Sequence, residues 1–372
     1  MSKAEPRAQG GPVAAGSVDS DAATGRAAVA VVILNWNGWR DTCECLRSLD
    51  ALDHPEFQVI VCDNGSTDDS LERLRSSTFA QRHGWRTLVR AGDRLVESEG
   101  REAREGDGNP GGRADRRPLV LIDNGENLGF SAGNNVGIRY ALGSSADFRY
   151  IWTLNNDTTV APETLSRLVS SIEREEGIGS VQSLLLQFED RDRIDSAGIE
   201  LRRRGGARDT LLGESASKVE SSIEDREIFG CCAASALYRS DALRAAGAFD
   251  EAFFLINEDS DLAFRLRRAG YSARLSVASK VYHKRGVSSP RKNRRIAFIA
   301  RGNKMRLTAR WWPRLASLPT LLLDAVRLLP LALAAPGLGV RDWLSSLGEV
   351  AAEYRAGASA ETRAEFRRRW MK

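Results

Sequence analysis

The sequence predicts an α/β protein in which helices flank a mostly parallel central sheet, followed by a helical, basic C-terminal extension. Two observations lead to this prediction. Short, wholly apolar runs rich in β-branched residues are typical of strands buried on both faces of a sheet. These runs alternate with segments of helical length, and such alternation indicates βαβ units. The strands expected in the first half are 28–34, 57–62, 119–122 and 150–154.

The first two units have clear boundaries. Ala28–Leu34 (AVAVVIL) is wholly apolar, and a polar turn and a helix over 40–49 follow it. The second strand, Phe57–Cys62, ends at Asp63. The next segment, NGSTDDSLERL, contains turn residues, capping hydroxyls and early acidic residues, a combination that predicts the start of a helix.

The third and fourth strands are followed by helices expected over 131–141 and 162–175. Residues 77–118 precede the third strand and include SEGREAREGDGNPGGRADRRP, a tract rich in glycine and charge without apolar periodicity. We expect a mobile insertion there. After Gly177 the pattern changes, and a helix over 259–269 and a strand over 273–282 lead into the C-terminal region.

Three regions follow from this pattern. Residues 1–27 combine alanine, glycine and charge without an apolar core, so they are expected to form a disordered leader and contain no signal peptide. Residues 28–290 form the α/β domain, and residues 291–372 a helical, basic region. Within the latter, 318–340 is strongly apolar but is interrupted by Asp324, Arg327, Pro330 and Pro336. A helix lying on a membrane surface or on the domain is therefore expected in preference to a membrane span.

Charge and cysteine content indicate the compartment of the protein and the kind of partner that it binds. The net charge is only +4, but no Asp or Glu occurs from Leu262 to Leu323. This stretch is either a solvated basic face or a surface for an anion such as a pyrophosphate, a lipid headgroup or a nucleic acid. The five cysteines form no CxxC pair, which is typical of reduced thiols. A cytoplasmic protein, peripheral on the cytoplasmic face of the membrane if the basic region binds lipid, is expected.

Polar side chains follow several of the expected strands. Asn35 and Asn37 follow the first strand, Asp63 the second, and 155–157 (NND) the fourth. Ligands of open parallel sheets bind beyond the carboxyl ends of the strands, so these residues predict a site for a hydroxyl-rich, phosphate-bearing ligand. Each residue alone is more often a turn former. The sequence has no GxGxxG after the first strand and no GxxxxGK[ST], which argues against a dehydrogenase and a P-loop enzyme.

Six segments in series resemble glycosyltransferase family 2, and specifically its rhamnosyltransferase-like branch. They are VVILNWNG (31–38), CDNGSTDDS (62–70), NLGFSAGNNVG (127–137), WTLNNDT (152–158), AFDEAFFLINEDSDLAFRLRRAGY (248–271) and VYHKRGVSS (281–289). The resemblance covers most of the chain, from about residue 28 to 306. It implies the GT-A fold of nucleotide-diphospho-sugar transferases, with the catalytic domain at 28–290.

The resemblance also implies roles for particular residues. Asp63 is expected to bind the base or ribose of the nucleotide-sugar donor. Asp157 occupies the metal position of the family's DxD-type motif, with Asn155 where many relatives have the first Asp. His283 would complete the shell of a divalent ion, and the mixed oxygen and nitrogen ligands suit Mn²⁺ or Mg²⁺. The full set expected to bind the donor is Asn35, Asn37, Asp63, Asn127, Gly133, Asn134 and Asn156.

Catalysis is expected at the start of the helix that begins near residue 258. The resemblance places the catalytic base on Asp259, with Glu258 as the alternative. Asp261 is expected to bind the acceptor or to orient the site, and Arg265 one turn later to pair with it. Acidic residues at a helix start also have a simpler role, since they complement the helix dipole.

These roles together describe an inverting, metal-dependent glycosyltransferase. One carboxylate would deprotonate the acceptor hydroxyl, and the metal would neutralise the departing nucleoside diphosphate. The branch suggests rhamnose from dTDP-rhamnose as the sugar, and a cell-surface polysaccharide or a polyprenyl-diphosphate-linked glycan as the acceptor. The alternatives are a non-catalytic nucleotide-sugar-binding scaffold and a nucleotidyltransferase.

The basic segment after His283 carries the paired Trp311 and Trp312 among many Arg and Lys residues. Such a combination is typical of a surface that contacts anionic membrane, and it also suits a polyprenyl diphosphate. Nucleic acid would use similar residues, but a sugar-transfer site beside them argues against that partner.

Overall fold

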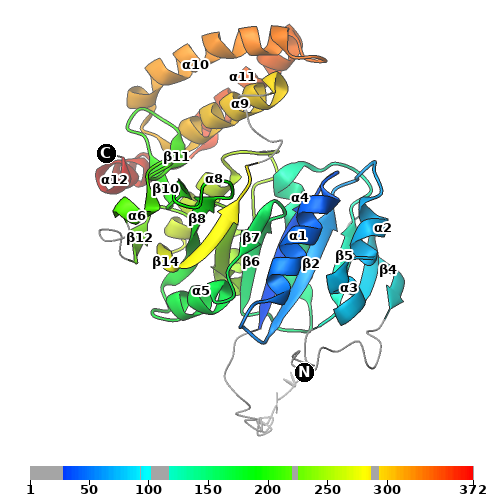
Figure 1. Cartoon of the computed structure of the whole chain (residues 1–372). Helices are drawn as coiled ribbons and strands as arrows, with labels where there is room; N and C mark the ends of the chain where they lie inside the picture. Colours follow the sequence, from blue (N-terminus) through cyan, green and yellow to red (C-terminus); the bar gives the residue numbers. More distant parts are fainter. Residues whose placement is uncertain (1–27, 93, 102–116, 220–224, 286–292, 372) are drawn as a thin grey trace, which may run out of the picture.

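The computed structural model describes residues 28–92, 94–101, 117–219, 225–285 and 293–371 (Figure 1). The expected leader, 1–27, lies outside these residues. The strands are β1 (Val29–Asn35), β2 (Phe57–Asp63), β3 (Trp85–Ala91), β4 (Arg94–Arg101), β5 (Leu119–Asp123), β6 (Tyr150–Asn155), β7 (Thr158–Val160), β8 (Ile178–Gln187), β9 (Ile194–Ser196), β10 (Ile199–Leu201), β11 (Ala207–Asp209), β12 (Arg226–Ile228), β13 (Ser235–Arg239) and β14 (Ser272–His283). The helices are α1 (Trp39–Asp50), α2 (Ser70–Arg75), α3 (Thr78–His83), α4 (Gly129–Gly143), α5 (Thr164–Ile172), α6 (Ala216–Val219), α7 (Ser240–Ala246), α8 (Glu258–Arg268), α9 (Arg294–Trp311), α10 (Arg314–Ala334), α11 (Val340–Ala356) and α12 (Ala360–Trp370).

One large sheet forms the centre of the molecule. Its order is β12-β14-β8-β13-β6-β1-β2-β5-β3-β4, with β7 on β14 and β9 on β8, while β10 and β11 form a separate hairpin. The run β6-β1-β2-β5-β3 is parallel throughout. Antiparallel β13 lies between β6 and β8 and joins this run to the second half of the sheet. The predicted α/β fold with a mostly parallel sheet is confirmed.

Helices cover both faces of the sheet, as the apolar strands require. Val29, Val31 and Ile33 of β1 pack in one cluster with residues of α1, α2, α3 and α5. Ala30 and Val32, the alternate residues of β1, pack in a second cluster with residues of α4, α7 and α8. Because successive strand residues point to opposite faces, an uninterrupted apolar run is the pattern of a strand between two helical layers.

The predicted insertion at 77–118 is wrong for much of its length. It contains α3, β3 and β4, and β3 pairs parallel with β5 and antiparallel with β4, so this segment extends the edge of the sheet. β4 (RLVESEGR) is almost entirely exposed. Its stability comes from backbone pairing with β3, and so its sequence lacks the apolar alternation by which strands are recognised. Residues 102–116 lie outside the described part of the chain.

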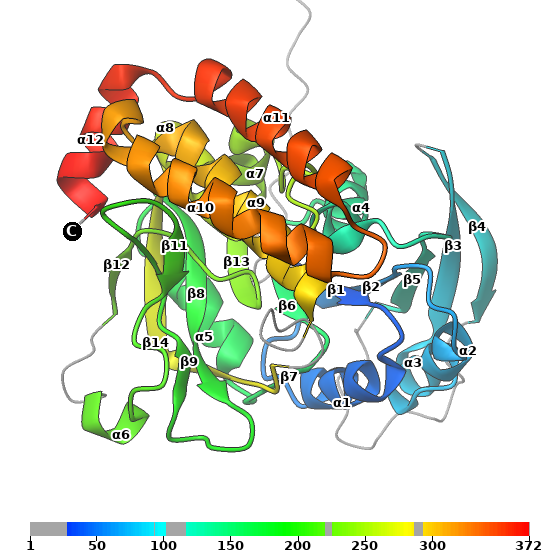
Figure 2. The same ribbon diagram turned by 90° about the horizontal axis from the view of Figure 1, so that it is seen from above.

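The C-terminal region is helical, as predicted. Figure 2 shows α10 lying across α9 with α11 alongside, on one side of the sheet. These three helices share an apolar cluster that includes Met305, Leu328 and Val350. Within the described residues, α10 is the one helix long and apolar enough to cross a membrane by length and composition alone.

The paired tryptophans are not on the surface, contrary to the expected membrane contact. Trp311 and Trp312 are 2% and 0% exposed. The Trp311 ring stacks on Phe264 of α8, with centroids 4.6 Å apart, and Phe366 of α12 packs edge-on against both rings. The two tryptophans therefore attach the C-terminal helices to the α/β domain.

Candidate active site

The polar residues predicted at the strand ends meet at one edge of the sheet. In the β1–β2 register Asn35 lies beside Asp63, and in the β1–β6 register Leu34 lies beside Asn155. Because these strands are parallel, their carboxyl ends share an edge. The turns that follow β1, β2 and β6 begin at this edge and carry the remaining polar residues of the predicted site.

Asn35 and Asp63 are linked by a buried hydrogen-bond network. The Asn35 Nδ2 donates to Asp63 Oδ2 at 2.7 Å, and the Thr42 hydroxyl donates to Asn35 Oδ1 at 2.7 Å. Asp63 also accepts from the Ser66 amide at 2.9 Å and from the Ser66 hydroxyl at 2.7 Å. A carboxylate has about four acceptor positions, so Asp63 keeps roughly one for a ligand.

Two further predicted donor residues lie around this network. Asn37 is exposed, with φ 50°, and its Oδ1 accepts from the Thr67 amide at 2.7 Å. The Asn156 Nδ2 donates to the Thr42 hydroxyl at 3.1 Å. Asn37 therefore fixes the turn after β2, and Asn156 joins the β6 end to the start of α1.

Asn127 lies beyond β5, next to the Asn35–Asp63 network at the ends of β1 and β2, here called the Asn35–Asp63 cradle. It is exposed, and its Oδ1 accepts from Asn64 Nδ2 at 3.0 Å and from the Gly129 amide at 2.9 Å. Asn64 directly follows β2, so this bond connects the ends of β2 and β5.

Gly133 and Asn134 do not fit the predicted contact with a donor. A Cβ at Gly133 would lie 2.6 Å from Leu34 Cδ1, so this glycine allows α4 to pack directly on β1. Asn134 is buried, and its Nδ2 donates to the Phe130 carbonyl within α4 at 2.9 Å. Gly133 therefore has a packing role against β1, and the buried Asn134 is bonded within its own helix.

His283 lies between two carboxylates. Its Nε2 is 3.1 Å from Asp157 Oδ1, and its Nδ1 is 2.8 Å from Asp195 Oδ2. Burial lowers the pKa of His283, but the hydrogen bonds and charges of Asp157 and Asp195 outweigh it and raise the pKa to about 9. Asp195, on β9, is itself paired with Arg285. The imidazole is therefore fixed in orientation, with Nε2 directed toward Asp157.

Glu258 and Asp259 begin α8 in different environments. Glu258 is 6% exposed, and its Oε2 has no hydrogen-bond partner among the residues that the structure describes. Burial, followed by the charge of Asp259, raises the pKa of Glu258 well above its ordinary value. Asp259 is partly exposed, and burial, followed by the charge of Asp209, raises its pKa to about 6.

The loop before β13 connects these groups. The Ala233 amide donates to Asp259 Oδ2 at 3.4 Å, and the Asn155 amide donates to the Ala234 carbonyl at 3.0 Å. The Asn155 Nδ2 in turn is 3.4 Å from His283 Nε2. Asp259, the β6 end and the His283–Asp157 pair therefore lie along one continuous edge.

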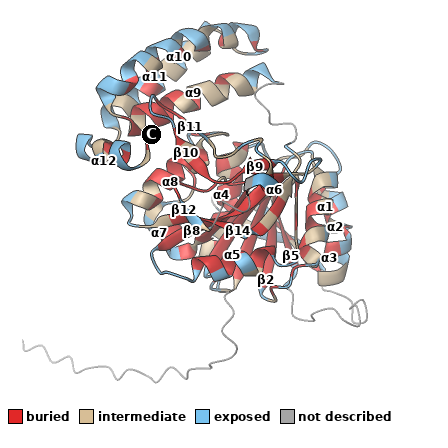
Figure 3. Ribbon diagram, turned by 60° about the vertical axis from the view of Figure 1, so that its left-hand side comes forward, coloured by how far each residue is buried: buried red, intermediate tan, exposed pale blue. Residues whose placement is uncertain are grey.

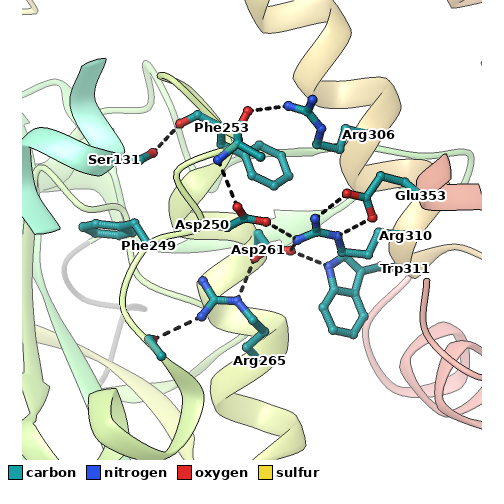
Figure 4. A network of polar contacts seen from close by, with 12 residues as sticks. Ser131, Phe249, Asp250, Phe253, Asp261, Arg265, Arg306, Arg310, Trp311 and Glu353 are labelled. Atoms are coloured by element: carbon teal, nitrogen blue, oxygen red, sulfur yellow. Dashed lines mark hydrogen bonds and ion pairs between the residues drawn. The ribbon is translucent and has the colours of Figure 1, made fainter. Parts of the chain in front are cut away.

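Asp261 is not positioned to bind an acceptor, which contradicts that part of the prediction. It is 0% exposed, and its carboxylate accepts from Arg265, Arg310 and the Trp311 indole, each at 2.8 Å (Figure 4). Arg310 also pairs with Asp250 and with Glu353 of α11. Asp261 thus fits the alternative prediction, orientation of the site, and its pairing with Arg265 is as expected.

Residues 30–93 and 113–247, more than half of the chain, match the profile of the family described as glycosyl transferase family 2. The chain belongs to glycosyl transferase family 2. The matched segment contains β1, β2 and the NND turn after β6. Among functionally curated proteins, none matches the sequence.

Solved structures of other glycosyltransferases are similar to this family 2 member in fold. GalNAc-T7, crystallised with UDP, GalNAc and Mn²⁺, is 14% identical with a TM-score of 0.56, and the likeness covers 92% of this chain and 56% of that one. The mannosyltransferase PcManGT from Pyrobaculum calidifontis, in complex with GDP-Man and Mn²⁺, is 16% identical with a TM-score of 0.47, covering 92% and 79%. S. aureus TarS 1–349 is 14% identical with a TM-score of 0.43, covering 92% and 91%. The chain spans little more than half of GalNAc-T7, and that likeness shows the fold, confirming the predicted GT-A type.

In this glycosyltransferase, Asp157 and His283 are the residues that could hold a divalent ion. They offer one oxygen and one nitrogen within 3.1 Å of each other, a donor set that suits Mn²⁺ or Mg²⁺. The described part of the chain contains no cluster of three or more His, Cys, Asp or Glu side chains able to hold a metal. The pair therefore fits an ion that takes its remaining ligands from a diphosphate and water.

Sequence reasoning missed two functional residues of this glycosyltransferase. Asp195 orients His283 from 88 positions away, and Arg310 holds Asp261 from 49 positions away. Neither lies in a segment of the family resemblance's motifs. The available signal was chemical: a His expected to bind a metal ion needs an acceptor for its other ring nitrogen, and Asp195 is one of many acidic residues that could supply it.

Proposed function

We propose that this chain transfers a sugar from a nucleotide-sugar donor to an acceptor hydroxyl with inversion, and that Asp259 is the catalytic base. The observation that carries the proposal is the arrangement along one sheet edge of the Asn35–Asp63 cradle, the Asp157–His283 pair and a carboxyl whose pKa is raised to about 6. The first suits a nucleoside, the second a diphosphate-bound ion, and the third a proton acceptor near neutral pH.

Asp259 suits the base better than Glu258 does. A base has to be ionised in the resting enzyme and reachable by the acceptor hydroxyl. Asp259 is partly exposed and its pKa is about 6, whereas Glu258 is buried with a pKa raised well above its usual range. Glu258 is therefore the less suitable base, because its buried carboxyl is not accessible to an acceptor hydroxyl.

At the donor end, Asp63 would accept a hydrogen bond from a hydroxyl of the ribose or from an N–H of the base. Asn37 and Asn156 would lie beside the bound donor. Asp157 and His283 would hold Mn²⁺ or Mg²⁺. The ion supplies charge neutralisation for the leaving diphosphate. Asp195 keeps the His283 ring in the orientation that directs Nε2 to the ion.

A single ionised carboxylate facing the acceptor favours direct displacement. Asp259 removes the proton of the acceptor hydroxyl as its oxygen attacks the anomeric carbon from the face opposite the diphosphate. Glu258 is buried, so its carboxyl is not placed to act as a nucleophile on the sugar. Retention would need such a nucleophile, so inversion is the outcome that this site supports.

The sugar proposed is a hexose, with dTDP-rhamnose as the first donor to test, and the acceptor a cell-surface polysaccharide or lipid-linked glycan. The resemblance to the rhamnosyltransferase-like branch supports this choice. The Mn²⁺ in the GalNAc-T7 crystal structure supports Mn²⁺ as the first ion to test.

The test is nucleoside diphosphate release from a panel of nucleotide sugars, with Mn²⁺, with Mg²⁺ and with chelator. Donor binding is measured in the same samples by calorimetry. Metal-dependent release from one donor, absent in Asp259→Asn, is the expected result. If no nucleotide sugar binds in the presence of either metal, the proposal is wrong.

A further inference from the structure

The outer side of α10 carries a continuous apolar face. Six large apolar side chains of this helix are exposed, four of them by more than 60%: Leu315 by 88%, Val326 by 71%, Leu333 by 62% and Leu322 by 61%. The α10 face consists of Leu315, Leu318, Leu322, Leu323, Val326 and Leu333. Apart from the adjacent pair Leu322 and Leu323, their spacings are three, four and seven residues, so at 100° per residue all six fall on one side of the helix. Figure 3 shows this side of α10 as exposed, in contrast to the buried sheet.

The opposite side of α10 is already packed against the protein. Leu321, Leu328 and Ala332 belong to the apolar cluster shared with α9 and α11. Asp324, 2% exposed, accepts from Arg301 at 2.7 Å and from Lys304 at 2.7 Å, both on α9. The α10 face therefore takes no part in the packing of the domain. A contiguous group of exposed apolar side chains of this kind marks an interaction site.

The charges on and beside the α10 face are mostly basic, and the carboxylate of Asp342, next to Arg341, accepts from the Gly339 amide at 2.9 Å in the cap of α11. Asp324 is the one acidic residue of α9 and α10, and it is buried and paired. Arg327 lies on the flank of α10, Arg341 is exposed at the start of α11, and Arg294 donates to the Ala334 carbonyl at the end of α10. α11, which shares a buried cluster with α10, adds two exposed apolar side chains, Val340 and Leu344, each at least 50% exposed.

We propose that the α10 face binds the surface of a bilayer that contains anionic lipid, with α10 lying parallel to that surface. Apolar side chains on one side and arginines along the flank are the features of a helix that lies in the interface, where the side chains enter the acyl boundary and the cations meet the lipid headgroups. The proposal goes beyond the transfer reaction and stands whichever sugar is transferred.

The structure disfavours two other uses of the same face. A span across the membrane would have to separate α10 from α9 and break the ion pairs of Asp324, or carry that carboxylate into the bilayer, at a high cost. A second copy of the chain would bring the arginines of the two faces together with no exposed acid on either α10 to neutralise them.

Flotation of the purified full chain with vesicles tests the proposal. Wild-type protein is expected to float with mixed phosphatidylcholine–phosphatidylglycerol vesicles and to float less with phosphatidylcholine alone. The double variant Leu322→Glu/Val326→Glu should lose at least about tenfold in partitioning, because each side chain forfeits its apolar insertion. Arg327→Gln/Arg341→Gln should lose roughly fivefold per arginine on the mixed vesicles only.

Val96→Glu is the matched control, because Val96 is 56% exposed on β4, at the far edge of the sheet. It should float like wild type, and both Glu variants should keep the wild-type circular dichroism spectrum and donor-dependent activity. Wild type that stays at the bottom of the gradient, or a double variant that floats unchanged, would overturn the proposal. A wild-type dimer that the double variant converts to monomer, without flotation, would assign the face to a second copy. Resistance of membrane-bound wild type to alkaline extraction would instead indicate a span.

Discussion

At the scale of single residues, the properties that make Asp259 a base also make it costly to the fold. Its folded pKa of about 6 lies above the ordinary value of 3.8 because the carboxyl is partly removed from water and because the charge of Asp209 acts on it. A carboxyl with a raised folded pKa binds protons more tightly in the native state, so ionising it above that pKa lowers the free energy of unfolding. Function and stability are opposed at this position.

Asp259→Asn should therefore lose activity and gain stability together. We expect the transfer rate to fall by about a hundredfold or more, since general-base assistance contributes on that order. The melting temperature at pH 8 should rise, by an amount corresponding to roughly 1 kcal/mol, because the amide carries no charge to desolvate. Nucleoside diphosphate release and thermal unfolding measure the two effects. Asp241→Asn, at an exposed position of α7, should change neither. Near wild-type activity in Asp259→Asn would reject its role as base.

The pH profile gives a second, independent check on Asp259. Because the base acts when deprotonated, kcat/KM should rise with pH through an apparent pKa of about 6. Asp209→Asn removes the neighbouring negative charge, so the same rise should occur at lower pH. The profile of each protein is measured with saturating metal. If the rise of kcat/KM occurs at the same pH in Asp209→Asn as in the wild-type protein, a group other than Asp259 controls it.

Only part of the site could be predicted from single residues. Asn35, Asp63, Asp157 and His283 stand at strand ends, and a strand end is visible in the sequence. Gly133 and Asn134 stand in the same motif as Asn127, but Gly133 packs against Leu34 of β1 and Asn134 is buried and bonded within α4. The direction of a helix face depends on packing that the motif does not contain. The partnership of His283 with Asp195 depends on where β9 lies beside β8, which is a tertiary contact.

At the scale of elements, one side chain ties α9 to α8 and α11. Arg310 of α9 pairs with Asp261 at 2.8 Å and with Glu353 at 2.6 Å, and it also pairs with Asp250 in the loop before α8 at 2.7 Å. The pKa of Arg310 is raised: burial opposes the shift, but the hydrogen bond to Glu353 and the charge of Asp261 outweigh it. The start of α8, which carries Asp259, is thereby held by the C-terminal helices.

Arg310→Met should destabilise the protein and impair catalysis without removing any residue of the site. Asp261 would remain buried with one fewer counter-charge, and breaking a buried pair in this way costs on the order of 3 kcal/mol. Chemical denaturation of the variant, compared with the exposed Arg295→Gln as control, measures the loss. A free energy of unfolding within error of wild type would mean that Arg265 and Trp311 alone satisfy Asp261.

Strands that are exposed on one or both faces were not predicted from the sequence. β1 and β2 are apolar on both faces and were identified within one residue of their bounds. β4 is exposed along nearly its whole length, and β3 buries only Thr87 and Leu88 fully, so both were assigned to an insertion. Backbone hydrogen bonds hold this edge, and they leave little trace in side-chain composition.

At the scale of the whole molecule, the C-terminal helices are part of the domain and not an appendage. Composition predicted their helicity and basic character, but it could not show which side of each helix is covered. Trp311 and Trp312, expected at the surface, are buried between α8, α9 and α12, while the exposed apolar face lies on α10. Both sets of residues are equally apolar in the sequence, and only the tertiary arrangement separates them.

This continuity predicts a single cooperative unfolding transition for the α/β domain and helices α9–α12. Phe264 of α8, Trp311 of α9 and Phe366 of α12 share one cluster, and the ion pairs of Arg310 cross the same boundary, so neither part can lose its structure and leave the other with a closed core. Circular dichroism reports the helices, and tryptophan fluorescence reports all eight tryptophans, which lie in both the α/β domain and the C-terminal helices, among them Trp152 in β6 and Trp311 in α9. The two denaturation curves should coincide, and the calorimetric and van't Hoff enthalpies should agree.

In Arg310→Met the common midpoint should shift without splitting. Two resolved transitions in the wild-type protein would show that the C-terminal helices fold independently, and the positioning of α8 by Arg310 would then lose its structural basis.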